Sequence, residues 1–256
     1  MKAIRAFIIL LLIPLSVFAA ERTWQVFKST HFLIFYNSAG DSQLNELAQR
    51  AEKYYNTITD DLGFTRFNFW TWDNRARIYL FDDQQEYMHN TGDPHWAAGQ
   101  AQIGSKTIST YITAIGFLDN VLPHEMAHII FREMVGFGNP AVPLWLDEGV
   151  ACFQEKKKNF NKSALGAKLN SGKFFSLGDL AASSPDTMKS DEDVVLFYTE
   201  SYSLVRYLVS AFGKDRFVLF CQYLRDKKDL ERSLRLAYSF KDMEDFENSW
   251  KKYILK

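Results

Sequence analysis

The chain has 256 residues, which suits one large domain or two small ones. Hydrophobic residues make up 47% of the sequence and charged residues 24%, an ordinary globular composition with enough apolar material for a sizeable core. The formal net charge is −1 and no basic cluster stands out, which argues against nucleic acid as a partner.

The first 20 residues are typical of a signal peptide. Lys2 and Arg5 precede an uncharged, mostly apolar run over residues 6–20, and Val17-Phe18-Ala19 provides a small residue before a cleavage point. We therefore expect residues 1–19 to be removed and the protein to be exported, to a periplasmic or extracellular location. The run is shorter than the roughly 20 residues of a membrane span, and an uncleaved membrane anchor is the alternative.

Residues 20–256 contain no internal repeat, low-complexity tract or long linker, so we expect a single domain. In its first part, apolar and alternating runs predict strands, and one helical periodicity predicts a helix over 44–58 with Asp41 or Ser42 as its N-cap. The predicted strands are 32–36, 76–81, 97–101 and 107–113, the last two around a turn at Gly104-Ser105.

From residue 119 onward the pattern is mostly helical. A helix is expected to about residue 134, capped by Asp119 or Asn120 with Pro123 in its first turn. Residues 157–190 are polar and are expected to be irregular except for 177–181. The other predicted helices are 144–156, 194–212 ended by Gly213, 215–224, 230–238 and a last one through Trp250 and Ile254. The fold class is therefore α+β, a small N-terminal sheet followed by a helical half.

One short motif carries chemistry. His124-Glu125-Met126-Ala127-His128 places two imidazoles at positions i and i+4, which share one face of a helix and can reach one metal ion. Glu125 lies about 100° round the helix from His124, so it can reach a water molecule at that ion without ligating it. The flanking residues are apolar, and a buried His-Glu-His group without a partner would be costly.

Glu148 follows His128 after a 19-residue gap that allows one loop and a returning helix. A catalytic zinc ion takes three protein ligands and keeps one open position. His124, His128 and Glu148 would complete that set, so we expect one Zn²⁺ per chain. The neighbouring Asp147 is expected to point elsewhere, either supporting a ligand or lying at the surface.

His124-Glu125-x-x-His128 followed by Trp145-Leu146-Asp147-Glu148-Gly149-x-Ala151 resembles the gluzincin metallopeptidases, and the closest likeness is to the bacterial peptidase MA-like families. The likeness covers residues 97–212. It implies a zincin-like domain in which an edge strand lies above the zinc and binds the substrate backbone. The strand predicted at 107–113 is the candidate for that edge, with 97–101 as the alternative.

A third segment, around Tyr198, resembles the Y-x-K-G helix of aminopeptidase N-type enzymes, which implies that Tyr198 stabilises the oxyanion; the alternative is that Tyr198 and Tyr202 are core aromatics. Glu200 and Ser201 replace the lysine and glycine. The segment that anchors the substrate N-terminus in aminopeptidases is missing, since 98–101 offer no carboxylate. Cys152 stands where thermolysin-like enzymes place a supporting aspartate, so support for the histidines must come from elsewhere.

These features predict a zinc metallopeptidase that acts on peptides or proteins, with Glu125 as the general base. A zinc-binding envelope protein that acts as a binding or assembly factor without turnover is the alternative. Two other histidines, His89 and His95, are expected to be loop residues. Export would permit a disulfide between Cys152 and Cys221, but buried free thiols account for them equally well, and we favour free thiols.

Overall fold

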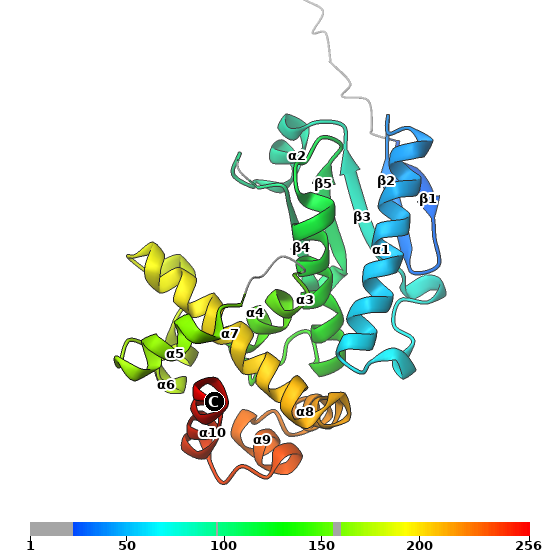
Figure 1. Ribbon diagram of the computed structural model, residues 1–256. Coiled ribbons are helices and arrows are strands. Elements are labelled where there is room, and N and C mark those ends of the chain that lie inside the picture. Colours follow the sequence, from blue (N-terminus) through cyan, green and yellow to red (C-terminus); the bar gives the residue numbers. More distant parts are fainter. Residues whose placement is uncertain (1–22, 96, 156–159) are drawn as a thin grey trace, which may run out of the picture.

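The computed structural model describes residues 23–95, 97–155 and 160–256. The signal peptide predicted over residues 1–19 lies outside the described residues. A small sheet is built from the N-terminal part of the chain, and the helices that follow gather below it (Figure 1). This arrangement confirms the α+β class, with a small mixed sheet followed by a mostly helical half.

The sheet has five strands in the order β1-β2-β3-β5-β4. The central strands β2, β3 and β5 are parallel, while β1 and β4 pair antiparallel at the two edges. The strands are β1 (Gln25–Lys28), β2 (Phe32–Tyr36), β3 (Ala76–Phe81), β4 (Gly99–Gln102) and β5 (Thr107–Tyr111). The predictions for β2 and β3 are confirmed, those for β4 and β5 differ by one or two residues at their ends, and β1 was not predicted.

One face of the sheet forms the core beneath the helices. Ile34, Ile78 and Ile108 stand side by side across β2, β3 and β5, and all three are fully buried. Helices α1 (Asp41–Asp61) and α3 (Leu122–Val135) pack on this side of the sheet, α1 against β2 and α3 against β4 and β5. The sheet therefore fixes α3, the helix that carries the histidine motif.

Both predicted helix caps are wrong. Helix α1 begins at Asp41 because Gly40 is its N-cap, and the Gln43 side chain accepts a hydrogen bond from the Gly40 N–H at 3.0 Å. Helix α3 begins at Leu122, with Pro123 in its first turn as expected, because a π-helical turn over Phe117–Val121 precedes it. Asp119 lies in that turn and its carboxylate pairs with Arg50 instead.

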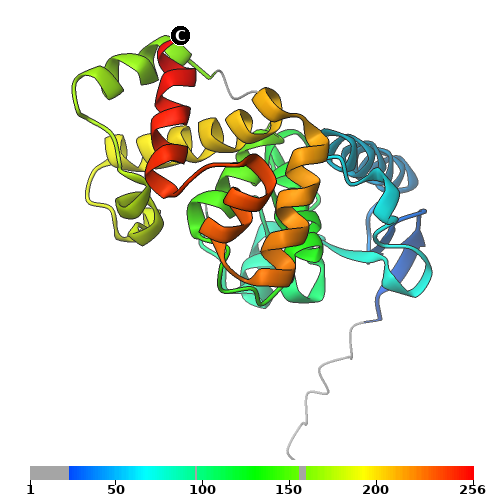
Figure 2. The same ribbon diagram turned by 90° about the horizontal axis from the view of Figure 1, so that it is seen from below.

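The other helices cover the rest of the chain. They are α2 (Gln84–Thr91), α4 (Leu144–Phe153), α5 (Lys162–Asn170), α6 (Leu177–Ala182), α7 (Asp191–Phe212), α8 (Lys214–Lys227), α9 (Leu230–Tyr238) and α10 (Met243–Leu255). Helix α4 lies between α3 and α7 and packs against both. Figure 2 shows α5 and α10 side by side at the end of the molecule away from α1.

Helix α5 corrects the expectation that residues 157–190 are irregular apart from 177–181; of these, 157–159 lie outside the described residues. The Asn161 side chain caps α5 by accepting from the Ala164 N–H, and Leu165 and Leu169, one turn apart, are buried. The segment predicted at 177–181 is α6, and Gly213 ends α7 as predicted. In the part of the chain that the structure describes, none of the helices has the length and apolar character of a membrane span.

Candidate metal centre

Helix α3 presents the histidine motif on one face. His124 and His128 are one turn apart, and the apolar residues between and after them hold α3 in the core. The helix flanks are fully buried at Met126, Ala127, Ile129 and Ile130, and His128 itself is only 7% exposed. The imidazoles therefore leave the core side of α3 and face the neighbouring helix α4.

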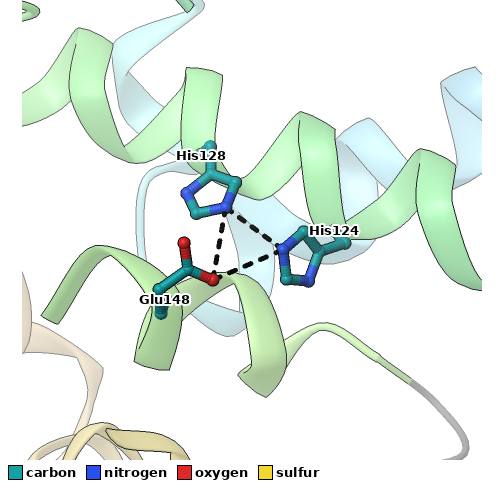
Figure 3. A group of neighbouring side chains, drawn as sticks. All are labelled: His124, His128 and Glu148. Carbon is teal, nitrogen blue, oxygen red and sulfur yellow. Dashed lines mark hydrogen bonds and ion pairs between the residues drawn. The ribbon is translucent and has the colours of Figure 1, made fainter. Parts of the chain in front are cut away.

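Helix α4 supplies Glu148. Gly149 allows α4 to approach α7 closely, since a Cβ at this position would lie 2.4 Å from the Ser201 carbonyl oxygen. With α4 pressed between α3 and α7, the Glu148 carboxylate points at the two histidines (Figure 3). Gly149, the residue directly after Glu148, thus allows α4 to pack between α3 and α7.

Three ligand atoms converge on one point. His124 Nε2 lies 3.2 Å from His128 Nε2, and Glu148 Oε2 lies 3.6 Å from the former and 3.8 Å from the latter. Ligand atoms about 2.0–2.1 Å from a tetrahedral zinc ion are separated by about 3.3 Å, so the three atoms nearly have the spacing of a His₂Glu site. The structure thus brings together the three residues predicted from the sequence, in a geometry that fits a metal ion.

Each histidine is held by a carboxylate at its other nitrogen. His124 Nδ1 donates to Glu155 Oε1 at 2.7 Å, and His128 Nδ1 donates to Asp147 Oδ1 at 3.1 Å. A carboxylate accepts only, so both rings carry their proton on Nδ1 and turn the Nε2 lone pair toward the metal position. These contacts are the histidine support that Cys152 does not supply.

Asp147 is part of a buried network. It is 4% exposed, and its second oxygen accepts from Arg132 Nε and Nη2, each at 2.7 Å. Burial alone would raise the pKa of Asp147, but the hydrogen bonds and charges of His128 and Arg132 lower it below its usual value. Of the two roles predicted for this residue, the structure shows that of supporting a ligand.

Asp147 also acts on His128. Burial alone would lower the pKa of this imidazole, but the hydrogen bond from the ring to Asp147 and the neighbouring carboxylates raise it to about 9. A histidine binds metal in its neutral form, so a proton and a metal ion compete for His128 Nε2.

Glu125 lies beside the three ligands rather than among them. Its carboxylate accepts a hydrogen bond from the Ala101 backbone on β4. Burial raises the pKa of Glu125. The charges of His128 and His124 act to lower this pKa, whereas the charge of Glu148 acts to raise it further. Glu125 is thus close enough to His124, His128 and Glu148 for their charges to shift its pKa and is not part of the three-ligand group, while its role as a base stays a prediction.

The edge strand near the site is β4, not the 107–113 segment. Strand β5 lies between β3 and β4, so the first candidate is wrong and the alternative at 97–101 corresponds to the edge. The residues of β5 are mostly buried, whereas β4 is short and polar, as edge strands often are. The backbone of β4 is what reaches Glu125.

Tyr198 and Tyr202 have different surroundings. Tyr198 lines a hollow of about 300 Å³ together with His124, Cys152 and Glu155. Burial, followed by the Glu148 charge, raises the pKa of Tyr198 to about 12. Tyr202 lies one turn further along α7, where it packs on Phe153 and Phe160 and its hydroxyl accepts from Arg206. The oxyanion role of Tyr198 stays a prediction, since no contact tests it.

The remaining histidines and cysteines are not among the three converging ligands. Within the described residues, the sets of three potential ligands all include His124, the second being His124, Cys152 and Glu155. His89 lies in the last turn of α2, not in a loop as expected, and His95 lies in the loop after it. Cys152 and Cys221 are both buried and are not joined in a disulfide, as predicted.

Comparison with protein-family profiles matches residues 72–256 to the Peptidase MA superfamily. The chain belongs to this superfamily. The match covers α3, α4 and α7, the three helices of the metal centre, and confirms the resemblance to peptidase MA-like proteins predicted from the sequence.

Two solved structures resemble the chain more distantly. Yeast LTA4 hydrolase in complex with bestatin is 15% identical with a TM-score of 0.48, over 91% of this chain and 39% of that one. Native yeast LTA4 hydrolase is 16% identical with a TM-score of 0.47, over 90% and 38%. The present chain thus spans about two fifths of the length of these structures. No curated protein matches the chain.

The sequence did not identify Glu155, Arg132 or Ala101 as parts of the site. Glu155 follows Glu148 by seven residues, about two helical turns, and this spacing was the one signal in the sequence, although the structure ends α4 at Phe153 and places Glu155 just beyond it. Arg132 follows His128 by four residues in the same way. Nothing in the sequence marked the Ala101 backbone, because its role depends on strand order.

Proposed function

We propose that this chain is a gluzincin-type zinc metallopeptidase that hydrolyses peptide bonds in proteins or peptides. The observation that carries the proposal is the convergence of His124 Nε2, His128 Nε2 and Glu148 Oε2, while both Nδ1 atoms are held by carboxylates. Nitrogen and carboxylate ligands with tetrahedral spacing suit zinc, and a set of three protein ligands is that of a catalytic site. One zinc ion per chain would be held by these three residues.

A bound zinc ion would supply a Lewis acid that polarises the scissile carbonyl and lowers the pKa of a water molecule. The carboxylate of Glu125, oriented by the Ala101 N–H, accepts the proton of the attacking water and delivers it to the leaving amine. Its raised pKa makes the carboxylate a stronger base for the first of these transfers. Tyr198, whose pKa of about 12 keeps the hydroxyl protonated, donates a hydrogen bond to the developing oxyanion.

The alternative is a zinc-binding protein without turnover. Zinc sites that serve only structure are closed by a fourth protein ligand. Among the described residues, the group around His124 Nε2 contains three ligands, and Glu125 stands next to it with the Ala101 backbone as a hydrogen-bond donor. A positioned base at an open site favours catalysis over storage or assembly.

The test separates metal binding from chemistry. Elemental analysis of purified protein should show about one zinc ion per chain, and Glu125→Gln should keep that zinc while hydrolysis of peptides falls at least about 10²-fold. Glu148→Ala is the matched control and should lose most of the zinc. A protein that refuses zinc contradicts the proposal. A Glu125→Gln variant with full activity would move the chemistry elsewhere, and one without zinc would make Glu125 a structural partner of the site.

We also propose that the protein acts outside the cytoplasm. The support is the signal-like sequence of residues 1–19, with Lys2 and Arg5 before an apolar run and a small residue at position 19. The mature N-terminus should then be near Ala20. N-terminal sequencing that finds residues 1–19 retained on a membrane-bound product would favour an anchored protein instead.

A further inference from the structure

A second, larger cavity adjoins the metal centre along helix α7. It has a volume of about 530 Å³ and lies between α5 and α7, and its apolar lining includes Phe160, Leu165, Leu196 and Tyr202. Cavities of roughly 300–1,000 Å³ with a mostly apolar lining are typical of sites that bind organic groups. This cavity, which we call the α5–α7 cavity, plays no part in the ligation or proton transfer described above.

The α5–α7 cavity and the hollow at the metal centre share two residues. Val195 and Thr199 line both, while Tyr198 and His124 line only the hollow and Tyr202 lines only the cavity. Val195, Thr199 and Tyr202 are spaced i, i+4 and i+7, so one face of α7 runs past both spaces. One helical turn rises about 5.4 Å, so Tyr202 lies about one turn from Tyr198. An extended peptide advances about 3.3 Å per residue, which puts the cavity within reach of a side chain next to the bond at the metal centre.

The walls of the cavity are held in place. Tyr202 packs on Phe160, Arg206 lies over the Phe160 ring at 5.4 Å, and Arg206 Nη1 donates to the Tyr202 hydroxyl at 3.2 Å. Leu165 and Leu196 are 2% and 8% exposed. By contrast Val195, at the junction with the metal centre, is 65% exposed, so an apolar side chain stands open where the two spaces meet. A substrate side chain entering the cavity would cover it.

The charges at the mouth select against an acidic side chain. Lys168 on α5 and Glu192 on α7 both line the cavity and are partly exposed; Lys168 Nζ and Glu192 Oε1 form an ion pair at 2.6 Å and so largely neutralise each other. Asp191 also lines the cavity and adds a negative charge. Among the residues that the structure describes, the one lysine of the lining, Lys168, is already paired with Glu192, so an aspartate or glutamate of a ligand would meet the Asp191 charge there.

We infer that the α5–α7 cavity is the specificity pocket of the enzyme and takes a large apolar side chain, aromatic or branched aliphatic, of the residue that flanks the scissile bond. This inference rests on the proposed peptidase function and names its substrate class. Burying an aromatic side chain in an apolar pocket should discriminate it from alanine by at least about 10-fold, since a single methylene in such a pocket already discriminates by roughly 10–200-fold.

Binding tests the pocket without relying on turnover. The zinc-loaded Glu125→Gln protein is titrated against fluorescein-labelled peptides of glycine and serine that carry one central Phe, Leu, Ala or Asp, and affinity is read by anisotropy. The Phe and Leu peptides should bind at least about 10-fold more tightly than the Ala peptide, and the Asp peptide should bind most weakly. Because each peptide carries only one variable side chain, the peptide can bind in the register that places this side chain in the cavity.

Two matched variants locate the preference. Ala164 is exposed on α5 and faces the cavity, whereas Ala167 is exposed on the same helix and lines a different surface near Leu255. In the same background, Ala164→Trp should abolish the difference between Phe and Ala peptides, and Ala167→Trp should preserve it. Val195→Asp, a change at an exposed position, should also abolish the difference between Phe and Ala peptides. This second variant keeps the test decisive if Ala164→Trp misfolds.

The outcomes separate this inference from the proposed function. Equal affinity for all four peptides overturns the pocket, as does a preference for Phe and Leu that survives both Ala164→Trp and Val195→Asp. If wild-type protein with zinc cleaves none of the peptides, yet the preference is present and disappears in those variants, then the peptidase proposal fails and the pocket stands as a binding site. If cleavage occurs with no preference in binding, only the pocket fails.

Discussion

Removing the Glu155 carboxylate tests whether the support of His124 is energetically important. Glu155 Oε1 accepts from His124 Nδ1 at 2.7 Å, and the side chain is 28% exposed. In Glu155→Ala the ring loses the partner that fixes its orientation and raises its basicity. Loss of such a partner typically costs 10–100-fold in metal affinity.

The structure places the expected loss at the lower end of that range. A hydrogen bond to a charged group is worth about 1.5–3 kcal/mol, and a factor of ten in affinity is about 1.4 kcal/mol. Because more than a quarter of the Glu155 side chain is open to solvent, water screens the contact and can replace part of it. We therefore expect zinc affinity to fall about 10-fold. In Glu155→Gln the amide oxygen still accepts the Nδ1 proton, so the loss should be smaller, about 3-fold.

The measurement is zinc dissociation by competition with a chromogenic chelator, alongside circular dichroism to check folding. Glu46→Ala, an exposed change on α1 that lies outside the ligand group and the hollow beside it, is the control and should bind zinc like the wild type. Unchanged affinity in a folded Glu155→Ala protein would refute the reasoning, because His124 would then be positioned by packing alone. An equal loss in Glu155→Gln and Glu155→Ala would show that the charge matters and the accepting oxygen does not.

Three further predictions concern helices α4 and α7. Tyr198→Phe should lower kcat roughly 10²–10³-fold with little change in stability, and Tyr202→Phe, one turn away, should leave kcat nearly unchanged; the reverse pattern would move the oxyanion role to Tyr202. Gly149→Ala should lower the free energy of unfolding by about 1–3 kcal/mol in a denaturant titration, because its methyl group meets the Ser201 carbonyl. Burial raises the pKa of Glu200 from 4.5 to about 8, so the folded protein holds a proton that the unfolded chain releases and stability falls as pH rises between these values. Glu200→Gln should remove that fall from a plot of Tm against pH, and an unchanged slope would contradict it.

The part of the site that the sequence predicted is the part set by local spacing. Two histidines at i and i+4 share a face on any helix, so His124 and His128 could be paired before the fold was known. Glu148 was placed by its distance along the chain and by the number of ligands that a catalytic zinc takes. Glu125 followed from its rotation about the same helix. None of these steps required knowledge of how strands or helices are arranged in space.

The errors lie where long-range packing decides. The polar sequence of β4 was the signal of an edge strand, but only the pairing of β5 with both β3 and β4 shows which strand is outermost. The start of α3 was misplaced because the backbone enters it through a π-helical turn, a variation that cap residues do not reveal. Helix α5 was missed because two buried leucines, Leu165 and Leu169, are too few to produce a periodic pattern in a polar segment.

The rotation of helix α7 shows where the residues that depart from the Y-x-K-G pattern point. Successive residues turn by about 100°, so position 200 lies about 200° from position 198. Tyr198 therefore lines the hollow beside His124, while the fully buried Glu200 faces the opposite way and accepts hydrogen bonds from the Phe175 N–H at 3.2 and 3.3 Å. The unusual glutamate belongs to the packing of α7 on the loop before α6. The glutamate at position 200 thus packs away from the hollow that Tyr198 lines, and it leaves the predicted role of Tyr198 open to the Tyr198→Phe test.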